Sequence, residues 1–323
     1  MAQGFRTSQA LYVVSKLGIP DLLINGPSDC NQLASRLHAD GKALFRVMRA
    51  LAAQGIFTQD STDRFGLTPM SQLLRSDTPG SMRYDLIFFG EEYYRAAGEM
   101  LHTVKTGETA FNHIYGKSHF DYLGENPEAS KIFNLAMAGL LAHHGNPLES
   151  YDFRGRHLIV DVGGGRGDLV VDLLKSNPGV EGIIYDLPQG LSEAKLLLKS
   201  AGIADRCQII TGSFFESVPT GGDVYLMSRI LHDWQDNEAK KILNNCRKAI
   251  REDGVLLLRE AVIPEGDTPS AGKQLDLTML FLVGGRERTE KEWHSLLHET
   301  GFALERVIKS KRGAFDIIEA TPR

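Results

Sequence analysis

A glycine-rich loop that directly follows an apolar segment constrains the fold of this chain more than any other feature. The segment reads Asp161-Val-Gly-Gly-Gly-Arg-Gly167. Its first two residues end the mostly apolar segment 158–162, and a stretch of helical spacing follows at 169–174. Glycines at such a junction let backbone N–H groups approach a ligand without a Cβ in the way. The loop therefore predicts a strand, a ligand-binding turn and a helix in succession.

The same alternation of strand and helix continues to the end of the chain. Short apolar segments predict further strands, and stretches of helical spacing separate them. The strands are expected at 182–186, 207–211, 223–227 and 255–259, and the helices at 190–201, 236–250 and 289–300. A hairpin then joins the last two expected strands, 303–308 and 315–319. The pattern predicts an α/β fold whose parallel, doubly wound sheet has one antiparallel terminal strand.

The N-terminal part has a different pattern of apolar residues. Apolar residues recur at helical spacing up to about residue 51, and a short hairpin is expected at 55–68, which together predict a winged-helix domain. Residues 84–145 are again helical in pattern and rich in aromatics, which suggests a substrate wall, a partner surface, or both. We therefore expect a winged-helix domain at 1–83, a helical region at 84–150 and a ligand-binding α/β domain at 151–323.

Composition excludes several classes of protein. The chain has 323 residues, 42% of them hydrophobic, which is typical of a globular protein with a full core. Its three cysteines lie far apart and predict neither a disulfide framework nor a zinc site. The net charge of −5 argues against nucleic acid as the main partner. No signal peptide or membrane-spanning segment is evident, so we expect a cytoplasmic location and no membrane partner.

Asp186 indicates what the glycine loop binds. It stands nineteen residues past Gly167 at the end of the next expected strand, where an acid accepts hydrogen bonds from both ribose hydroxyls of a nucleoside. In the dinucleotide fingerprint the third glycine position would be Asp168, and its charge would repel a pyrophosphate. The loop therefore suits a nucleoside cofactor without phosphates, such as S-adenosylmethionine.

Several further segments resemble one family. They are Phe120-Asp-Tyr-Leu-Gly-Glu-Asn-Pro127, Phe133-Asn-Leu-Ala-Met137, Tyr185-Asp-Leu-Pro188, Gly212-Ser-Phe-Phe215, Arg229-Ile-Leu-His-Asp-Trp234, Glu260-Ala-Val-Ile-Pro264 and Gly284-Gly-Arg-Glu-Arg-Thr289. With the glycine loop and the winged-helix start, they make the chain similar to the metal-independent, S-adenosylmethionine-dependent small-molecule O-methyltransferases of the caffeate and hydroxyindole type. That family includes bacterial natural-product tailoring enzymes.

The resemblance implies a set of cofactor contacts. Gly163, Gly165 and Gly167 would cradle the methionine part of S-adenosylmethionine, and Asp186 would hold the ribose. Gly212, Ser213 and Phe214 would line the adenine, with the Ser213 hydroxyl standing where many relatives have Asp. Arg229 resembles a cofactor-contacting arginine of bacterial members, with a surface arginine at a strand end as the alternative.

The resemblance also implies the catalytic groups. His232 would be the general base, because a neutral imidazole can take the proton of a phenol as its oxygen attacks the methyl carbon. Glu260 and Glu287 would be its flanking acids, with a helix cap or a surface acid as the alternative. Asp233 is expected to cap the helix that begins near residue 236, and Trp234 to be a packing residue. No metal is expected.

Assignments for substrate and partner rest on the resemblance alone. Phe133, Met137, Met279 and Phe281 are candidates for the substrate pocket, although Met and Phe at helical spacing are as often core. The roles of His143 and His144 stay open between pocket and surface. A homodimer formed through the N-terminal domain is implied, with a hydroxylated aromatic small molecule as substrate and S-adenosylhomocysteine as product.

Besides O-methylation of an aromatic or polyketide-like hydroxyl, the sequence leaves two other function classes to consider. A winged helix can bind DNA, but residues 1–75 hold eight Lys or Arg against five Asp or Glu, and residues 42–51 hold no Asn or Gln to read bases. An N-methyltransferase, or an enzyme drifted to another reaction on this fold, is the closer alternative. The combination of His232, Glu260 and Glu287 favours oxygen, since a nitrogen acceptor would not need this base.

Overall fold

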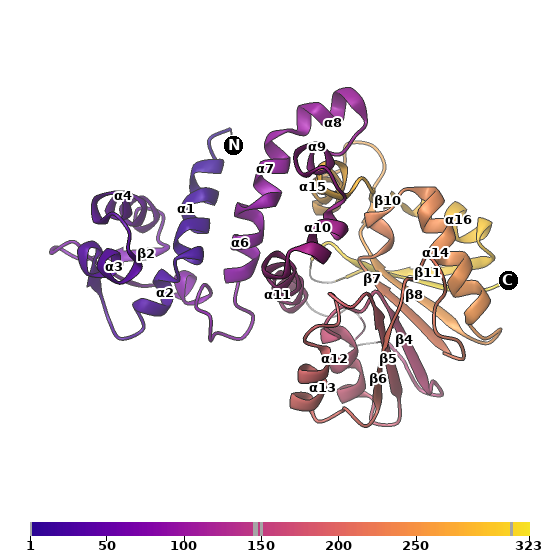
Figure 1. Ribbon diagram of the computed structural model, residues 1–323. Coiled ribbons are helices and arrows are strands. Elements are labelled where there is room, and N and C mark those ends of the chain that lie inside the picture. Colours follow the sequence, from indigo (N-terminus) through magenta and orange to yellow (C-terminus); the bar gives the residue numbers. More distant parts are fainter. Residues whose placement is uncertain (1, 145–147, 149–150, 311–312) are drawn as a thin grey trace. The chain divides into compact units, whose positions relative to one another are not determined.

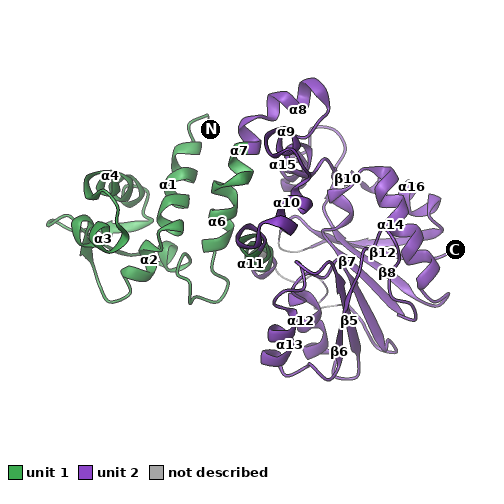
Figure 2. Cartoon of the chain, in the orientation of Figure 1, with its two compact units in different colours: residues 1–95, 131–140 green, residues 96–130, 141–323 purple. Residues whose placement is uncertain are grey.

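The computed structural model describes residues 2–144, 148, 151–310 and 313–323 and divides the chain into two compact units. Unit 1 comprises residues 1–95 and 131–140, and unit 2 comprises residues 96–130 and 141–323 (Figure 2). Among the described residues, no helix combines the length and the apolar character needed to cross a membrane.

Unit 1 is helical with a small sheet (Figure 1). Its elements are α1 (Phe5–Lys16), α2 (Ile19–Leu22), β1 (Ser28–Asp29), α3 (Cys30–Leu37), α4 (Gly41–Ala52), β2 (Phe57–Gln59), β3 (Arg64–Leu67), α5 (Pro69–Gln72) and α6 (Arg83–Gly90). Strands β2 and β3 form the predicted hairpin, and β1 pairs with the other side of β3. Val14, Met48, Phe57 and Phe65 lie fully buried in its core.

Close helix contacts extend unit 1 beyond the region expected for it. Helix α6 packs along α1, and a Cβ on Gly90 would lie 2.3 Å from the ring of Tyr12. A Cβ on Gly139 would lie 2.8 Å from Oδ1 of Asp85, so the middle of α11 runs close to α6. Helix α6 and part of α11 thus group with the N-terminal helices in unit 1, and the domain boundaries expected at 83 and 150 stay predictions.

Among the described residues, five α-helices follow α6 along the chain before the main sheet begins. They are α7 (Glu92–Gly98), α8 (Met100–Thr106), α9 (Ala110–Tyr115), α10 (His119–Glu125) and α11 (Pro127–His144). The contacts of α8 and α9 include each other and the segment Met279–Val283 of unit 2. The helical character expected for residues 84–145 is thus confirmed.

Unit 2 contains the predicted sheet. Its strands are β4 (Leu158–Val162), β5 (Glu181–Asp186), β6 (Cys207–Thr211), β7 (Val224–Ser228), β8 (Val255–Glu260), β11 (Phe302–Ile308) and β12 (Asp316–Pro322). They are ordered β11-β12-β8-β7-β4-β5-β6. Strands β4 to β8 pair in parallel, while β12 pairs antiparallel with both β8 and β11. The expected parallel sheet with one antiparallel strand is confirmed.

Helices cover both faces of this sheet (Figure 1). One apolar core joins the sheet to α12 (Asp168–Ser176) and α13 (Ala194–Ala201), and a second joins it to α14 (Asp236–Ala249) and α16 (Glu290–Glu299). All six residues of β8 are buried, as expected for a strand covered on both faces.

Shorter elements gather at the carboxyl edge of the sheet. They are η2 (Leu231–Asp233), β9 (Val262–Ile263), α15 (Ala271–Thr278), η3 (Met279–Val283) and β10 (Arg288–Thr289). β10 pairs in parallel with β9, which lies just past the end of β8. This pairing brings the segment that carries Glu287 back to the sheet edge, where ligands bind in open α/β folds.

Candidate active site

The backbone conformation of the glycine loop requires glycine at three positions. Gly163, Gly165 and Gly167 have φ of 75°, 55° and 86°, in the left-handed region that favours glycine. A Cβ on Gly163 would lie 2.4 Å from Ile230, and one on Gly167 would lie 2.3 Å from Ile184. No heavy atom lies within 4 Å of the Cβ position on Gly165, so the loop is open there. The loop packs tightly against β5 on one side and against the residue before η2 on the other, and it keeps one open position.

Asp186 ends β5 beside this loop. Its Oδ2 accepts the N–H of Gly165 at 2.7 Å, and its Oδ1 accepts the N–H of Leu187 at 2.6 Å. A carboxylate has about four acceptor positions, so capacity for two hydroxyl donors is left. Burial raises the pKa of Asp186, and it raises the pKa of the fully buried Asp161 to about 7, with the charge of Asp186 adding to this shift.

The segment expected to line the adenine follows β6. A Cβ on Gly212 would lie 2.3 Å from the hydroxyl of Tyr185, so a larger residue there would require the tyrosine ring to move. Oγ of Ser213 accepts the N–H of Phe215 at 3.3 Å and so helps to form the turn. Phe214 packs edge-on against Trp234, with ring centroids 6.1 Å apart. The structure thus brings the glycine loop, Asp186 and residues 212–214 to one sheet edge.

His232 lies in η2, beside the two buried carboxylates of Glu260 and Glu287 and the partly exposed one of Asp233, whose side chain is 16% exposed. Its Nδ1 forms a 2.7 Å hydrogen bond with Oε1 of Glu287 and lies 3.7 Å from Oε2 of Glu260. Its Nε2 lies 3.5 Å from Oδ1 of Asp233. The exposed fractions of His232, Glu260 and Glu287 are 4%, 0% and 2%. The three residues that the sequence assigned to catalysis therefore meet in one buried cluster.

Glu260 fixes the turn that carries the histidine. Its Oε1 accepts the backbone N–H groups of Ile230 and Leu231 at 3.0 and 2.8 Å. Burial raises the pKa of Glu260, while the neighbouring His232 opposes that shift. Replacing this side chain would leave two buried N–H donors without their acceptor as well as removing a charge.

Glu287 reaches the histidine from the opposite segment. Its backbone N–H donates to Oδ1 of Asp276 at 2.7 Å, and Arg286 N–H donates to the carbonyl of His232 at 2.8 Å. Burial raises the pKa of Glu287 to about 8, and the charge of Asp276 adds to the shift. A Cβ on Gly285 would lie 2.0 Å from the carbonyl oxygen of His232, so the two segments can touch only through glycine.

Two residues at this site were not assigned from the sequence. The prediction that Asp233 caps the following helix is wrong, because Gln235 occupies the N-cap of α14 and Asp233 is turned toward His232. Burial raises the pKa of Asp233 to about 7, and the charge of His232 lowers it in part. The buried Arg288 donates to the carbonyls of Leu231 and Trp234 and so holds η2 in place. The one sequence feature that could have indicated this role is the position of Arg288 in the Gly284–Thr289 segment, which carries part of the resemblance.

Arg229 has an unusual backbone. Its φ is 59°, and its N–H donates to the carbonyl of Arg259 at 2.9 Å, which turns the chain sharply after β7. Its guanidinium lies 5.4 Å from the ring centre of Phe315, and that of Arg259 lies 4.8 Å from the same ring. The Phe315 ring lies 6.4 Å from that of His232. Arg229 is therefore close to the catalytic cluster, and its cofactor contact stays a prediction.

The substrate-pocket candidates fall into two groups. Met279 and Phe281 are buried in η3, a single turn of π-helix that packs against η2 and α9. Phe133 and Met137 lie in unit 1, where Phe133 packs against Phe88 with ring centroids 5.6 Å apart. His143 is exposed on α11, and the side chain of His144 lies outside the described residues.

Two groups of side chains among the described residues could hold a metal ion. One is His232, Glu260 and Glu287, and the other is His102, Glu108 and His113, and in each group the ligand atoms lie within 4.8 Å of one another. In the first group Oε1 of Glu260 already accepts two N–H groups, and His232 is hydrogen-bonded to Glu287. That arrangement suits the orientation of a base, and its metal independence stays a prediction.

Comparison with known protein families matches both parts of the chain. Residues 97–303 match the O-methyltransferase domain, and residues 1–77 match the O-methyltransferase dimerisation domain. A phenazine O-methyltransferase of Lysobacter antibioticus is 45% identical and covers 100% of this chain and 94% of that protein. A phenazine-1-carboxylate N-methyltransferase of Pseudomonas aeruginosa is 35% identical over 93% of this chain and 90% of its own length.

Solved structures of methyltransferases are also similar to this chain. A mitomycin 7-O-methyltransferase superposes with a TM-score of 0.93 at 36% identity, covering 100% of this chain and 96% of that one. An O-methyltransferase from neocarzinostatin biosynthesis, solved with S-adenosylmethionine and 2-hydroxy-5-methyl naphthoic acid, has a TM-score of 0.86 at 31% identity and covers 98% and 96%. The expected fold, the winged-helix start and the cofactor class are thereby confirmed.

Proposed function

Because this chain belongs to the S-adenosylmethionine-dependent methyltransferases of the O-methyltransferase family, we propose that it methylates a hydroxyl oxygen on an aromatic or polyketide-like small molecule of secondary metabolism. The observation that carries the proposal is the buried contact of His232 with Glu287 and Glu260. A hydroxyl acceptor must lose its proton as it attacks, so a base held at this position serves oxygen best.

The sheet edge fits the cofactor. The positive-φ glycines leave the loop open at Gly165, and Asp186 keeps acceptor capacity for a ribose diol. The bound cofactor supplies a methyl carbon activated by its sulfonium. We assign Gly163, Gly165 and Gly167 to its methionine part, Gly212, Ser213 and Phe214 to its adenine, and Arg229 to a further contact.

His232 takes the proton in this scheme. When Glu287 accepts the proton of Nδ1, the lone pair of Nε2 is free for the acceptor hydroxyl. The ring then gains a proton at Nε2 as the new O–CH₃ bond forms. Glu287, Glu260 and Asp233 surround the ring with carboxylates, which favours the imidazolium that results. Glu260 also fixes the turn on which the ring is mounted.

The acceptor class follows from the relatives and the apolar candidates. Met279 and Phe281 lie on η3, which contacts the η2 segment that carries His232, and we assign these two residues to an aromatic substrate. The roles of Phe133 and Met137 stay predictions from the resemblance. The named substrates of the relatives include phenazines, an aminohydroxybenzoate and a dihydroxynaphthoate, all planar ring systems. An aromatic ring bearing a hydroxyl is therefore the expected acceptor.

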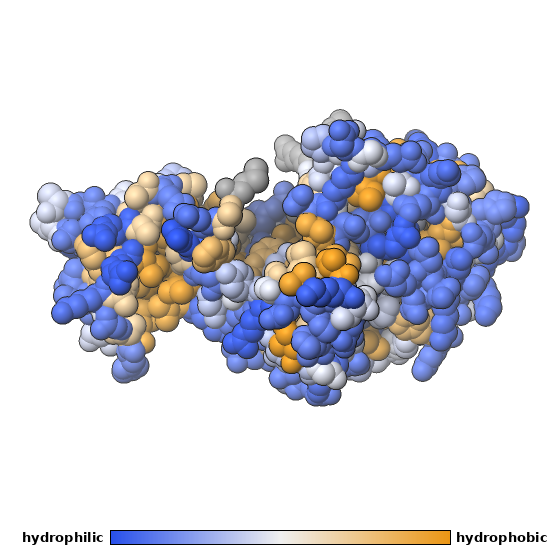
Figure 3. All heavy atoms as spheres, turned by 90° about the horizontal axis from the view of Figure 1, so that it is seen from above, coloured by the Kyte–Doolittle hydropathy of each residue, from blue (hydrophilic) through white to orange (hydrophobic). Residues whose placement is uncertain are grey.

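A homodimer is part of the proposal. Residues 1–77 match a dimerisation domain, and unit 1 exposes several large apolar side chains. Figure 3 shows apolar residues, in orange, reaching the surface among hydrophilic ones. The exposed ones in unit 1 include Phe5, Ile24, Met70 and Leu73. Exposed apolar surfaces of this kind are typical of protein–protein contacts. Helix α4, the candidate DNA-recognition helix, contains no Asn or Gln that could read bases, and it buries Leu44, Met48 and Leu51.

One experiment tests the acceptor atom directly. The full chain is incubated with methyl-labelled S-adenosylmethionine and a panel of hydroxylated phenazines, benzoates and naphthoates, each paired with its amino analogue. We expect labelled methyl ethers, identified by the carbon chemical shift of the new methyl group. Labelled N-methyl products with no ether from any hydroxylated compound would contradict the proposal and favour the N-methyltransferase alternative.

A further inference from the structure

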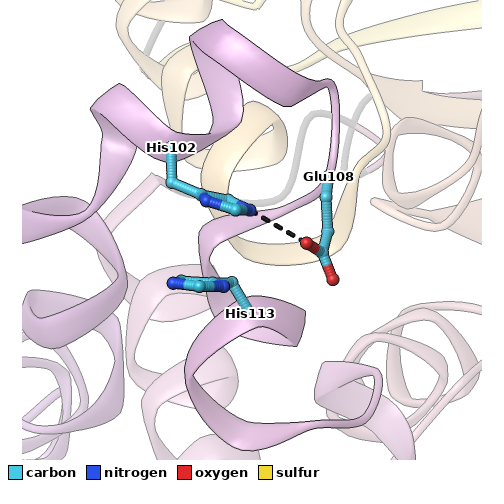
Figure 4. A group of neighbouring side chains, drawn as sticks. All are labelled: His102, Glu108 and His113. Atoms are coloured by element: carbon cyan, nitrogen blue, oxygen red, sulfur yellow. Dashed lines mark hydrogen bonds and ion pairs between the residues drawn. The ribbon is translucent and has the colours of Figure 1, made fainter.

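A second histidine–carboxylate group lies outside the catalytic centre, on helices α8 and α9 (Figure 4). His102 on α8 and His113 on α9 stack with ring centroids 3.7 Å apart and planes 13° apart. Nε2 of His102 lies 2.9 Å from Oε2 of Glu108, which stands in the turn between the two helices. The three residues thus come from one twelve-residue segment of unit 2.

The turn between the helices holds these side chains together. Gly107 ends α8 with φ of 79°, and its N–H donates to the carbonyl of Thr103 at 2.8 Å. Thr106 Oγ1 accepts the N–H of Glu108 at 3.1 Å, and Thr109 caps α9 by accepting the N–H of Asn112 at 3.2 Å. Capping on both sides therefore fixes the backbone that presents Glu108 between the two histidines.

Two imidazoles and one carboxylate are a donor set that suits zinc and similar divalent transition metals. Such an ion binds nitrogen and oxygen at about 2.0–2.2 Å, so its ligand atoms lie roughly 3.3–3.5 Å apart. The ligand atoms now lie within 4.8 Å of one another, and rotation about the Cβ–Cγ bonds can close this gap. One ring must also turn out of the stack, and that terminal torsion is broad.

Exposure makes this movement possible. Glu108 and His113 are exposed, and the side chain of His102 is 21% exposed. The remaining coordination position would face solvent and take water. The catalytic group differs in this respect, because its acids are fully buried and one of them accepts two backbone N–H groups.

We propose that His102, Glu108 and His113 bind one divalent transition-metal ion of the zinc type, with water completing its coordination. The ion joins α8 to α9. Helix α8 has seven residues, of which only Thr103 is buried, and its Leu101 and Val104 are 63% and 70% exposed. A helix so short and so little buried gains order from a link to its neighbour.

Titration of the untagged, metal-free full chain with Co²⁺ tests the site. A tetrahedral N/O site gives intense visible absorption, and Zn²⁺ added afterwards should abolish it by displacement. We expect one equivalent to bind. Because partners outside the ligand shell alone change metal affinity by about 10- to 100-fold, losing a ligand in His113→Gln or His102→Gln should weaken binding by at least about tenfold.

The chain offers matched controls for this experiment. His294 and His298 on α16 form another exposed pair, with ring centroids 6.3 Å apart, so His298→Gln should bind Co²⁺ as the unaltered chain does. His232→Asn should also bind unchanged, since the catalytic group is a separate one. Binding that survives His113→Gln, that is lost in His232→Asn or His298→Gln, or that is absent from the unaltered chain, would overturn the proposal.

Discussion

Two clusters in unit 2 use the same residue types in opposite surroundings. His232, Glu260 and Glu287 are at most 4% exposed, whereas the side chain of Glu108 beside His102 is 51% exposed. Burial raises the pKa values of Glu260, Glu287 and Asp233. The comparison teaches that burial, rather than residue type, converts a histidine and carboxylates into a base with a fixed orientation.

The largest expected effect concerns the base. His232→Gln removes the proton acceptor while keeping a polar side chain, so turnover should fall by about 10²–10⁴-fold. Affinity for S-adenosylhomocysteine, measured by calorimetry, should change little because His232 does not lie in the glycine loop. His113→Gln is the matched change in the exposed cluster, and its turnover should equal that of the unaltered chain. Near-normal turnover in His232→Gln would sink the base assignment.

A smaller loss is expected from Glu287→Gln. The amide can still accept the proton of Nδ1, but it carries no charge to favour the imidazolium, so kcat should fall by roughly 10- to 100-fold. The pH profile of kcat should also change, because the variant lacks a carboxyl whose pKa burial raises to about 8. Glu108→Gln, the matched change at the surface, should alter neither. An unchanged profile in Glu287→Gln would contradict a direct role in tuning the base.

Cofactor affinity tests the assignment of Asp186 to the ribose of the cofactor. Asp186→Asn keeps the side chain's shape but weakens its acceptance from a ribose diol, and hydrogen bonds to charged groups contribute about 1.5–3 kcal/mol. We expect the Kd for S-adenosylmethionine to rise by at least about tenfold, as measured by calorimetry. The matched control is Asp253→Asn, an exposed acid paired with Arg251 far along the chain from the loop. Equal affinity in Asp186→Asn would refute the ribose assignment.

Hydrophobic periodicity and sequence motifs predict most of the fold and of the candidate site. The physical reason why an element is predictable differs from one element to the next. Strands such as β4 and β8 are mostly apolar, with charged residues only at Asp161, Arg259 and Glu260, so their burial on both faces makes them recognisable in the sequence. His232 follows β7 and Glu260 ends β8, and the carboxyl ends of these two neighbouring parallel strands meet at one edge. Glu287 comes from an excursion through α15 and η3, and only the resemblance pointed to it.

Other features could not be inferred from local pattern. Asp233 looks like a helix cap two residues before α14, and only the three-dimensional course of η2 turns it toward Nε2 of His232. The compact unit formed by α6 and the middle of α11 depends on packing between helices far apart in sequence. The pairing of His102 with His113 likewise depends on the turn at Gly107.

A pH-dependent effect on stability should come from Asp161. Its folded pKa is raised from 3.8 to about 7 by burial, so the folded state binds the proton more tightly and loses stability as pH rises from about 4 to 7. Asp161→Asn removes this loss and should raise the unfolding free energy at pH 8 relative to pH 5, on the order of 1–2 kcal/mol after allowance for relaxation. Denaturant unfolding at the two pH values measures it, and Glu108→Gln should show no such difference. A variant equally stabilised or destabilised at both values would disprove the claim.

The smallest expected effect is that of metal removal on kcat, and it distinguishes the exposed cluster from the buried one. If the exposed cluster binds an ion and the buried one works through protons alone, dialysis against EDTA should remove metal without changing kcat. The physical reason is that an in-line methyl transfer from a sulfonium develops no charge that needs a Lewis acid, whereas the acceptor proton needs a base. Activity measured before and after dialysis, with metal content followed by atomic absorption, checks this. Activity that falls with EDTA and returns with Zn²⁺ would place the ion in the His232 cluster, and the contrast between the two sites would then fail.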